Sequence, residues 1–473
     1  MSLIKSISGI RGQIGGIAGE NLTPLDILKF SSAYGTFIKQ NYPDIKPKIV
    51  IGRDARISGE MVKNIVAGAL SGLGINVIDM SFASTPSVEM AVVSQEAQGG
   101  IIITASHNPQ GWNALKLLND QGEFLTKEDG EKVLALAEKN NFESVPEENL
   151  GYYLVKPYLD QEHIKKVLSM PLVEKDLIAA KKFKVVVDGI NSVGGLIVPQ
   201  ILEGLGVKDI IELNCEPNGV FAHKPEPLAE NLTAIMDMVK KEKADLGIVV
   251  DPDVDRLAFI NENGNMFGEE YTLVAVAEYV LENFEVLNKA NPGKYNKSSV
   301  SNLSSSRALK DVTEKYNGTY EAAAVGEVNV VSKMKETKAV IGGEGNGGVI
   351  FPEIHYGRDA LVGIALFLSS LAKKNIKMSE LRKSLPEYFM VKDRVELTPG
   401  LDLKKILADI KAEYQSEKIT DIDGVKIDWS DSWVHLRASN TEPIVRIYAE
   451  AKTMEIAEAK VKEIKDKILA YIK

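Results

Sequence analysis

Short apolar runs and helically spaced apolar positions alternate along most of the chain. The pattern predicts a strand over 48–51, a helix over about 59–73 and a second strand over 75–79. Ser58 is placed to cap that helix and Gly74 to end it. A similar succession of strand, glycine-rich loop, helix and strand begins at Lys182. Two such units predict duplicated α/β domains with mainly parallel sheets.

The second half of the chain continues this plan and then departs from it. A helix over 267–284, a strand near 297–303 and an apolar helix over 359–375 predict a third α/β unit. Short strands and amphipathic helices then alternate up to the helical spacing of the last segment, which predicts a small α+β domain. We therefore place the domains at 1–152, 153–258, 259–378 and 379–473.

Composition narrows the class of protein. A chain of 473 residues, 44% hydrophobic and 26% charged, is an ordinary soluble protein too long for one core. Its net charge of −10 argues against a nucleic-acid partner. The single cysteine, Cys215, excludes an internal disulfide and favours a reducing compartment. Neither a signal peptide nor an apolar stretch of roughly 18 residues is present, so we expect a cytoplasmic protein without a membrane partner.

The first candidate for chemistry is the segment "GIIITASHNPQGWNALK", residues 100–116. Its β-branched run reads as a buried strand, and Asn-Pro reads as the turn that ends it. Ser106 is therefore expected where a strand leaves the core. His107 and Asn108 follow it directly, and Lys116 lies ten residues further on.

A second candidate is "ADLGIVVDPDVDRLAFI", residues 244–260, in which two apolar strands enclose Asp251, Asp253 and Asp255. Alternate carboxylates in a tight loop can converge on one hard cation. An EF-hand is excluded, because Arg256 stands where that loop needs glycine and strands flank the loop. The alternative is an acidic hairpin tip with solvated carboxylates.

The glycine-rich segment "GGEGNGG", residues 342–348, contains the spacing of a dinucleotide-binding loop. The extended, proline-containing segment behind it excludes that function, which needs a helix. The segment is either a simple glycine turn or a loop that presents Glu344 and Asn346 to a sugar, whose hydroxyls suit a carboxylate and an amide.

A fourth loop, in "HLRASNTEPIVRIYAE" (435–450), gathers groups that suit a phosphate: a guanidinium, two hydroxyls and loop N–H groups. Its candidate anion ligands are Arg437, Ser439, Asn440, Thr441 and, on the next strand, Arg446. The alternative is an exposed polar turn.

Four further residues have two interpretations each. Arg11, Arg53 and Arg56 lie in glycine-flanked loops and are either structural or anion-binding. His223, among prolines, either orders its loop or contacts a substrate.

Together these loops resemble the α-D-phosphohexomutase superfamily. "TASHNP" is similar to its phosphoserine loop, and "DPDVDR" to its metal loop D-G-D-G-D-R, with Pro252 and Val254 in place of glycines. "GEGNG" is similar to its sugar-recognition loop and "RASNTEP" to its phosphate-binding loop. The order and spacing fit across essentially the whole chain. The resemblance implies three similar mixed-sheet α/β domains and a C-terminal α+β domain around a central cleft.

The resemblance also implies roles for these residues. Ser106 would carry a phosphoryl group, with Mg²⁺ held by Asp251, Asp253, Asp255 and a phosphate oxygen on Ser106. Lys116 would be the general acid/base, and His107 and Arg256 would complete the catalytic set. Substrate would be bound by Glu344, Asn346, Arg11, Arg437, Ser439, Asn440, Thr441 and Arg446. The phosphoryl shift would pass through a hexose 1,6-bisphosphate, which also primes the enzyme.

The sugar is the open question at this stage. Gly348 stands where some members carry a histidine, so no proton-transfer role is assigned to that position. We expect conversion of glucosamine 6-phosphate to glucosamine 1-phosphate by a monomer or homodimer, on the general need for this step in cell-wall synthesis. The alternatives are a phosphomannomutase/phosphoglucomutase and a non-catalytic sugar-phosphate sensor. Intact Ser106, Lys116 and aspartates argue against the sensor.

Overall fold

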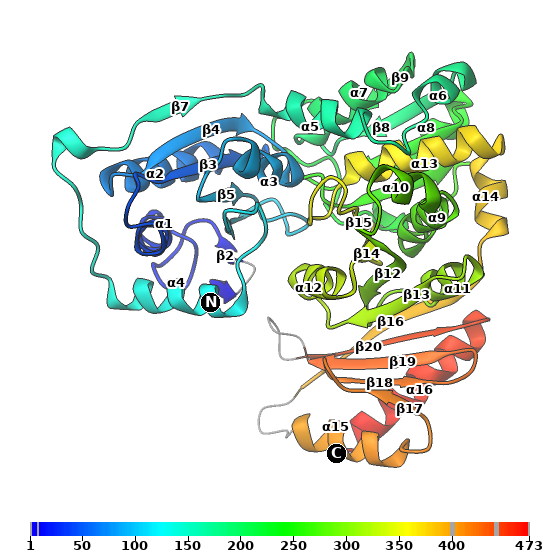
Figure 1. The fold of residues 1–473 in the computed structure, drawn as a ribbon. Coiled ribbons are helices and arrows are strands. Elements are labelled where there is room, and N and C mark those ends of the chain that lie inside the picture. Colours follow the sequence, from blue (N-terminus) through cyan, green and yellow to red (C-terminus); the bar gives the residue numbers. More distant parts are fainter. Residues whose placement is uncertain (1, 7–8, 398–402, 439–443, 472–473) are drawn as a thin grey trace.

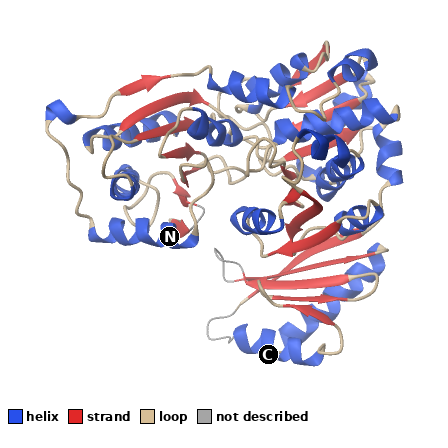
Figure 2. Ribbon diagram, viewed as in Figure 1, coloured by secondary structure: helices blue, strands red, loops and turns tan. Residues whose placement is uncertain are grey.

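The structure is a computed structural model that describes residues 2–6, 9–397, 403–438 and 444–471. In this part of the chain the strands form four sheets, of seven, four, four and five strands in chain order. Figure 1 shows the N-terminal unit on one side and the other three stacked on the opposite side, and Figure 2 shows helices against the sheets. Among the helices described, none combines the length and apolar content that a bilayer crossing requires.

The first sheet has the strand order β1-β2-β6-β5-β3-β4-β7. It is a mixed sheet: β3 pairs in parallel with β4 and β5, whereas β6 pairs antiparallel with β2 and β5. Its strands are β1 (Ile4–Ser6), β2 (Gly9–Gln13), β3 (Lys48–Arg53), β4 (Asn76–Phe82), β5 (Gly99–Ile103), β6 (Trp112–Leu118) and β7 (Tyr153–Val155). Its helices are α1 (Pro24–Asn41), α2 (Gly59–Gly72), α3 (Thr85–Ser94), α4 (Lys127–Lys139) and the 3₁₀ turn Glu147–Asn149.

The predicted succession over 48–79 is confirmed by β3, α2 and β4. Gly74, with φ +82°, ends the helical segment as expected, because it adopts the left-handed conformation that glycine tolerates. The predicted cap is wrong: Ser58 has helical dihedrals and makes no cap hydrogen bond, and its Oγ instead accepts one from Asn113 Nδ2 at 2.9 Å.

The second and third sheets are also mixed, with the orders β11-β10-β8-β9 and β13-β12-β14-β15, each with one antiparallel edge strand. The second unit contains α5 (Leu159–Leu168), α6 (Lys175–Lys181), β8 (Lys184–Asp188), α7 (Gly194–Gly204), β9 (Asp209–Leu213), the 3₁₀ turn Ala229–Asn231, α8 (Thr233–Glu242), β10 (Leu246–Val250) and β11 (Leu257–Asn261). The third contains α9 (Glu269–Glu282), α10 (Phe284–Ala290), β12 (Asn296–Asn302), α11 (Ala308–Lys315), β13 (Thr319–Ala323), α12 (Glu327–Thr337), β14 (Ala339–Glu344), β15 (Gly348–Ile350), α13 (Ala360–Lys374) and α14 (Met378–Ser384).

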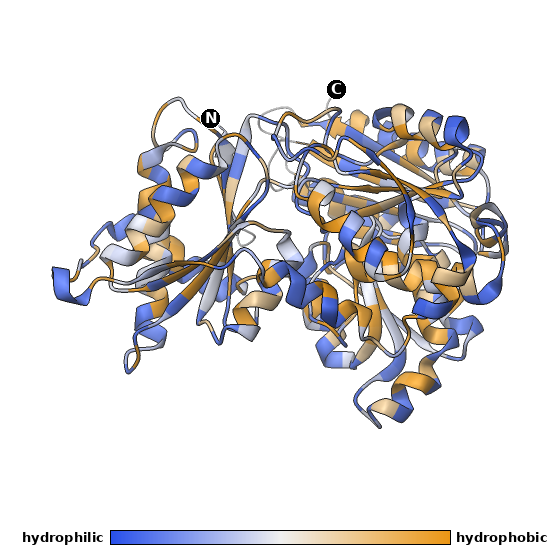
Figure 3. Ribbon diagram, turned by 90° about the horizontal axis from the view of Figure 1, so that it is seen from above, coloured by the Kyte–Doolittle hydropathy of each residue, from blue (hydrophilic) through white to orange (hydrophobic). Residues whose placement is uncertain are grey.

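These two units share one hydrophobic core. Helix α13 is buried along most of its length and packs against α9 of its own unit and against α5 and α6 of the second unit. Phe367 of α13 stacks on Phe259 of β11 with ring centroids 3.9 Å apart and meets Phe267 edge-on at 5.1 Å. Figure 3 shows apolar residues concentrated on the strands and on the helices that cover them.

The last sheet is antiparallel throughout, with the order β16-β20-β19-β18-β17, which confirms the predicted α+β unit. Its elements are β16 (Phe389–Glu396), α15 (Leu403–Glu413), β17 (Lys418–Thr420), β18 (Val425–Asp428), β19 (Trp433–Ala438), β20 (Ile444–Ala451) and α16 (Met454–Ala470). Helix α16 packs against β16 and β20. The sheet also contacts the third unit, where Ser304 Oγ lies 2.8 Å from His435 Nδ1 and Lys426 Nζ donates to the Leu303 carbonyl at 2.8 Å.

The four domain boundaries given above stay predictions. Strand β7 joins the first sheet beyond residue 152, and β11 of the second sheet ends at Asn261.

The shared core makes a prediction about stability. Phe367→Ala removes a fully buried ring between two units, so the free energy of unfolding should fall by about 3–5 kcal/mol. Urea denaturation followed by intrinsic fluorescence measures this. Val286→Ala, at a side chain 45% exposed, is the control and should change little. A Phe367→Ala midpoint equal to that of the control would contradict a shared core.

Candidate active site

Ser106 lies in the turn that follows β5, as predicted. Its φ of +46° is left-handed, which is uncommon for a residue with a side chain and places its Oγ away from the strand. The Oγ donates to Asp251 Oδ2 at 2.7 Å, and the Ser106 N–H donates to Thr104 Oγ1 at 3.0 Å. The Ser106 hydroxyl of the first unit is thus hydrogen-bonded to the aspartate loop of the second unit.

One buried arginine holds this turn in place. The Arg56 side chain directs its N–H groups at five backbone carbonyls and one carboxylate: Ser106 (2.6 Å), Asn108 (2.7 Å), Pro109 (2.8 Å), Trp112 (2.9 Å), Gln110 (3.4 Å) and Asp54 (3.1 Å). These partners occupy the five donors of a guanidinium. Arg56 is therefore structural, which rules out its anion-binding interpretation. Arg53 pairs with Glu60 at 2.9 Å.

The three aspartates lie between β10 and β11, and all three are fully buried. The prediction of a strand–loop–strand is confirmed, whereas the alternative of a solvated hairpin tip is wrong, because the first and third units cover the loop. Asp251 Oδ1 accepts from the N–H groups of Asp255 (3.2 Å) and Arg256 (3.1 Å). Val254 adopts φ +63°, at a position where the family's motif has glycine.

Basic side chains from two other units reach these carboxylates. Lys116 Nζ, on β6, lies 2.7 Å from Asp253 Oδ2 and 3.3 Å from Asp255 Oδ2. Arg358 Nη2 lies 2.8 Å from Asp255 Oδ2. Burial alone would raise the pKa of Asp253, but the Lys116 ammonium holds it below its usual range. Burial and the two neighbouring carboxylates raise the pKa of Asp251.

The donor set fits a hard divalent cation. One oxygen each of Asp251, Asp253 and Asp255 can lie within 4.8 Å of the others. The Oδ1 atoms of Asp253 and Asp255 are buried, and neither has a hydrogen-bond partner within the described part of the chain. Buried carboxylate oxygens without partners are costly unless a cation binds them, and oxygen ligands are those that Mg²⁺ prefers.

Glu344 ends β14, and the turn behind it leads into the antiparallel strand β15. This confirms that the glycine loop is not a dinucleotide-binding loop. Glu344 Oε1 accepts from Asn302 Nδ2 at 2.8 Å and from the Gly326 N–H at 3.2 Å, and Oε2 accepts from Arg358 Nη1 at 3.3 Å. Asn346 Nδ2 lies 3.4 Å from the same Oε2. The carboxylate is therefore fixed in orientation.

The sequence analysis missed Arg358. Its guanidinium joins three carboxylates of different segments, with Nε 2.8 Å from Glu327 Oε2 in addition to its contacts with Asp255 and Glu344. It thereby connects the aspartate loop to the glycine loop. Arg358 stands between Gly357 and Asp359, the same context as that of Arg53, and this local pattern could have marked it. Its contacts with the three carboxylates depend on the tertiary structure.

A central cavity brings together residues from all four units. It is lined by six residues that the sequence analysis singled out and by nine that it did not: His107, Arg256, Glu344, Asn346, Arg437 and Arg446, and then Glu226, Glu269, Glu270, Asn302, Ser304, Val325, Gly345, Lys392 and Tyr448. Arg11, on β2, is outside this lining, although burial and the nearby Arg256 charge lower its pKa. Ser439, Asn440 and Thr441 lie outside the described residues.

The C-terminal sheet presents a row of arginines across three strands. Arg437 of β19 is in register with Arg446 of β20, which is in register with Arg394 of β16. Like charges directly opposite on neighbouring strands are unfavourable. Asp423 Oδ2, 3.2 Å from Arg437 Nε, offsets part of this charge. Arg437 and Arg446 line the cavity, so the row suits an anion bound there.

His223 orders its own loop. Its Nε2 lies 3.3 Å from Asp188 Oδ2 and its Nδ1 lies 2.8 Å from the Lys224 carbonyl oxygen. It also lines a neighbouring cavity of about 600 Å³, which shares His107 and Glu226 with the central one. The structure therefore supports the loop-ordering interpretation.

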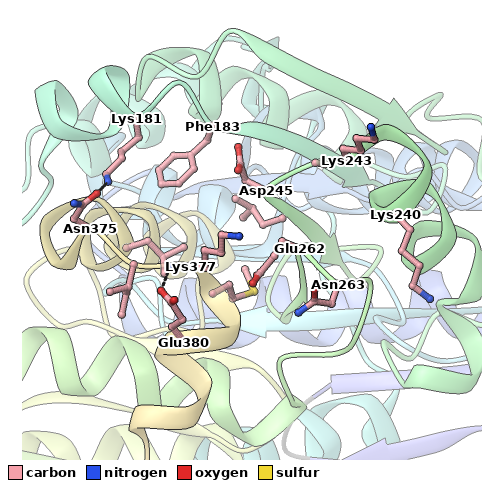
Figure 4. Close-up of a pocket in the computed structure, with 15 residues that line it drawn as sticks. Lys181, Phe183, Lys240, Lys243, Asp245, Glu262, Asn263, Asn375, Lys377 and Glu380 are labelled. Atoms are coloured by element: carbon pink, nitrogen blue, oxygen red, sulfur yellow. Dashed lines mark hydrogen bonds between the residues drawn. The ribbon is translucent and has the colours of Figure 1, made fainter.

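A larger cavity, of about 830 Å³, lies away from these groups (Figure 4). It is lined by Asp245 at the start of β10, whereas the aspartate loop follows the end of that strand. Surface lysines such as Lys240 and Lys243 surround it, and none of the predicted site residues lines it. Its size therefore does not make it the active site.

Comparison with known proteins agrees with this arrangement. Models of the phosphoglucomutase/phosphomannomutase family match residues 4–144 (alpha/beta/alpha domain I), 161–264 (domain II), 269–389 (domain III) and 390–468 (C-terminal domain). A phosphoglucomutase/phosphomannomutase of Thermococcus kodakarensis is 37% identical over 95% of this chain and 94% of its own. A phosphoglucosamine/phosphogalactosamine mutase of Sulfurisphaera tokodaii is 35% identical over 98% of this chain and 99% of its own.

Among solved structures, a phosphoglucomutase/phosphomannomutase family protein of Burkholderia thailandensis shares the fold, with a TM-score of 0.81 and 23% identity over 99% of this chain and 97% of that one. The expected four-domain architecture is thus confirmed. The chain belongs to the phosphoglucomutase/phosphomannomutase family of the phosphohexomutase superfamily.

Proposed function

We propose that this chain is a mutase that interconverts glucosamine 6-phosphate and glucosamine 1-phosphate. One observation carries the proposal: the Ser106 hydroxyl is hydrogen-bonded to Asp251 in a buried loop of three aspartates, next to the Lys116 ammonium. A hydroxyl beside a cation-binding loop suits reversible phosphoryl transfer. The adjoining cavity supplies Glu344 for a sugar and Arg437 and Arg446 for a second phosphate.

In the proposed reaction, the phosphoryl group of phosphorylated Ser106 passes to the O1 hydroxyl of the 6-phosphate. The bond to Oγ breaks as the bond to O1 forms, and the product is the 1,6-bisphosphate. After the bisphosphate turns around, the O6 phosphoryl group returns to Ser106 and leaves the 1-phosphate. A divalent cation such as Mg²⁺, held by Asp251, Asp253 and Asp255, supplies electrostatic stabilisation of the transferring group when it is bound.

The chain's own residues position the substrate and move the proton. Lys116, which Asp253 and Asp255 hold as an ammonium, is the proposed general acid/base: it gives a proton to the departing oxygen and takes up the proton that the attacking hydroxyl loses. Glu344, fixed by Asn302 and Arg358, accepts hydrogen bonds from sugar hydroxyls. The arginine row holds the phosphate that does not react, together with Ser439, Asn440 and Thr441 as predicted from the sequence.

The choice of sugar has two candidates. The two relatives described above carry names with different sugars at 37% and 35% identity, so a phosphomannomutase/phosphoglucomutase is the alternative. The cavity wall contains three carboxylates besides Glu344, namely Glu226, Glu269 and Glu270. Carboxylates suit the C2 ammonium of an amino sugar better than a C2 hydroxyl. Lys392 already pairs with Glu269 and Glu270, and Arg256 lies 3.9 Å from Glu226, so a substrate ammonium would share these carboxylates with the protein's own cations.

The phosphoserine can be tested directly. Intact-protein mass spectrometry should find a phosphorylated fraction, and peptide mapping should place it on Ser106. Ser106→Ala should lower kcat by roughly 10³-fold or more, because the group that carries the phosphoryl is lost. Ser94→Ala, at an exposed serine of the same unit, is the control. Turnover near that of the wild type in Ser106→Ala would end the proposal.

The cation can be tested by its removal. EDTA should abolish turnover and added Mg²⁺ should restore it. Asp253→Asn keeps the side chain's shape but removes one charged ligand, so a higher Mg²⁺ concentration should be needed for half-maximal turnover. Asp245→Asn, at the opposite end of β10, should not change this concentration. Full turnover in the presence of EDTA would contradict a cation requirement.

Substrate choice needs a side-by-side measurement of kcat/KM. Glucosamine, glucose and mannose 6-phosphates would each be assayed with a bisphosphate primer. A hydrogen bond to a charged group is worth roughly 1.5–3 kcal/mol, so glucosamine 6-phosphate should lead by about one to two decades. If glucose or mannose 6-phosphate leads by tenfold or more, the alternative assignment is correct.

A further inference from the structure

A second cluster of metal-ligating side chains lies outside the active site. It consists of His163 on α5, and of His355 and Asp359 in the segment that leads into α13, with ligand atoms within 4.8 Å of one another. The Nε2 atoms of His163 and His355 both face Asp359 Oδ2, at 2.8 Å and 3.2 Å. The side chains of His163 and Asp359 are buried, and that of His355 is 10% exposed.

The far nitrogen of each imidazole faces an oxygen of helix α3. His163 Nδ1 lies 2.9 Å from Ser87 Oγ, and His355 Nδ1 lies 3.2 Å from Glu89 Oε2. Metal-binding histidines usually have this arrangement, in which an oxygen on the second nitrogen fixes the ring and its tautomer. The two Nε2 atoms are thereby turned toward one point.

Glu89 brings a second buried carboxylate to this cluster. Its side chain is 1% exposed, its Oε2 faces His355 Nδ1, and its Oε1 makes no hydrogen bond with a residue that the structure describes. A buried carboxylate with few partners is costly unless positive charge lies nearby. Because the Asp359 and Glu89 carboxylates flank the same imidazole, a cation bound at this cluster would offset two negative charges.

Asp359 has one oxygen left for a ligand. Its Oδ1 caps α13 by accepting from the N–H groups of Leu361 (2.8 Å) and Val362 (3.3 Å). Its Oδ2 is the atom that both imidazoles face. A divalent cation between these three atoms would leave both imidazoles neutral and would balance the charges of Asp359 and Glu89.

We propose that His163 Nε2, His355 Nε2 and Asp359 Oδ2 bind a divalent transition metal, with Zn²⁺ as the ion that suits them. Two imidazoles and a carboxylate favour Zn²⁺ over Mg²⁺, which prefers oxygen ligands alone. The site is distinct from the aspartate loop, whose ligands are all oxygens.

Such an ion would join three units behind the active site. Helix α3 belongs to the first unit, His163 to the second, and Asp359 to the third. The same α3 begins at Thr85, whose Oγ1 donates to Asp253 Oδ2 at 2.6 Å. Asp359 directly follows Arg358, which contacts Asp255. The metal would therefore fix the two segments that carry Thr85 and Arg358, both of which contact the aspartate loop.

The test is a titration of the full-length, chelator-treated protein with Co²⁺ in excess Mg²⁺, which occupies oxygen-ligand sites. We expect the protein to bind one equivalent of Co²⁺ and to show the strong visible absorption of a low-coordinate, nitrogen-bound ion. Added Zn²⁺ should displace the Co²⁺ and remove this absorption. His355→Gln and His163→Gln keep a hydrogen-bond donor for Asp359 but should lower Co²⁺ affinity by roughly 100-fold or more. Glu89→Gln should lower it by about 10–100-fold.

Two control variants locate the ion. Asp253→Asn and His435→Gln, which alter the aspartate loop and a buried histidine elsewhere, should leave the Co²⁺ spectrum and affinity unchanged. Absence of the spectrum in the wild-type protein, its persistence at wild-type affinity in His355→Gln, or its loss in Asp253→Asn would each overturn the proposal. If a histidine variant does not fold, X-ray absorption of the wild-type Zn²⁺ protein decides: two imidazole ligands support the site, and an all-oxygen shell rejects it.

Discussion

The repulsion among three buried carboxylates governs the arrangement of this molecule. Asp251, Asp253 and Asp255 are removed from water within a few ångströms of one another, where like charges repel strongly. Two of the cations that face them belong to other units, Lys116 to the first sheet and Arg358 to the segment before α13, while Arg256 of the same loop lies 4.0 Å from Asp255 Oδ1. Arg358 is also shared with two glutamates, so the protein's own charges do not balance the loop. The aspartate loop therefore depends on the assembly of the domains, and its excess negative charge suits a bound cation.

The three α/β units deliver their functional groups in the same way. Ser106 follows β5, Asp251 follows β10 and Glu344 ends β14, and each of these strands has a parallel neighbour. In open α/β sheets, ligands bind beyond the carboxyl ends of the strands. Here the loops at three such ends line one cavity, through His107, Arg256 and Glu344. The antiparallel C-terminal sheet contributes differently, through the register that places Arg437 opposite Arg446.

The sequence predicts what depends on local pattern and misses what depends on contact between units. The β-branched runs before Ser106 and Asp251 correctly predict two strands and the points where the chain leaves them. They can do so because hydrophobic periodicity and composition are properties of the local sequence. The burial of the aspartate loop was not predictable, since it is covered by residues distant in the chain. Arg56 was ambiguous for the same reason: its carbonyl and carboxylate partners span two loops. Arg358 follows a glycine, as Arg53 does, but this local pattern does not show that its guanidinium contacts three carboxylates.

In the proposed reaction, the charges around the cavity would distinguish the two phosphates of a hexose bisphosphate. At the Ser106 end, the aspartate loop would repel a phosphate unless a cation is bound there, so binding of the reacting phosphate would depend on the metal. At the other end, Arg437 and Arg446 would meet a phosphate with positive charge. A phosphate would therefore bind first at the arginine row, which leaves the other end of the sugar facing Ser106. Because the two ends differ in this way, a bisphosphate that turns around would exchange the two environments without any change in the charges of the arginines and aspartates.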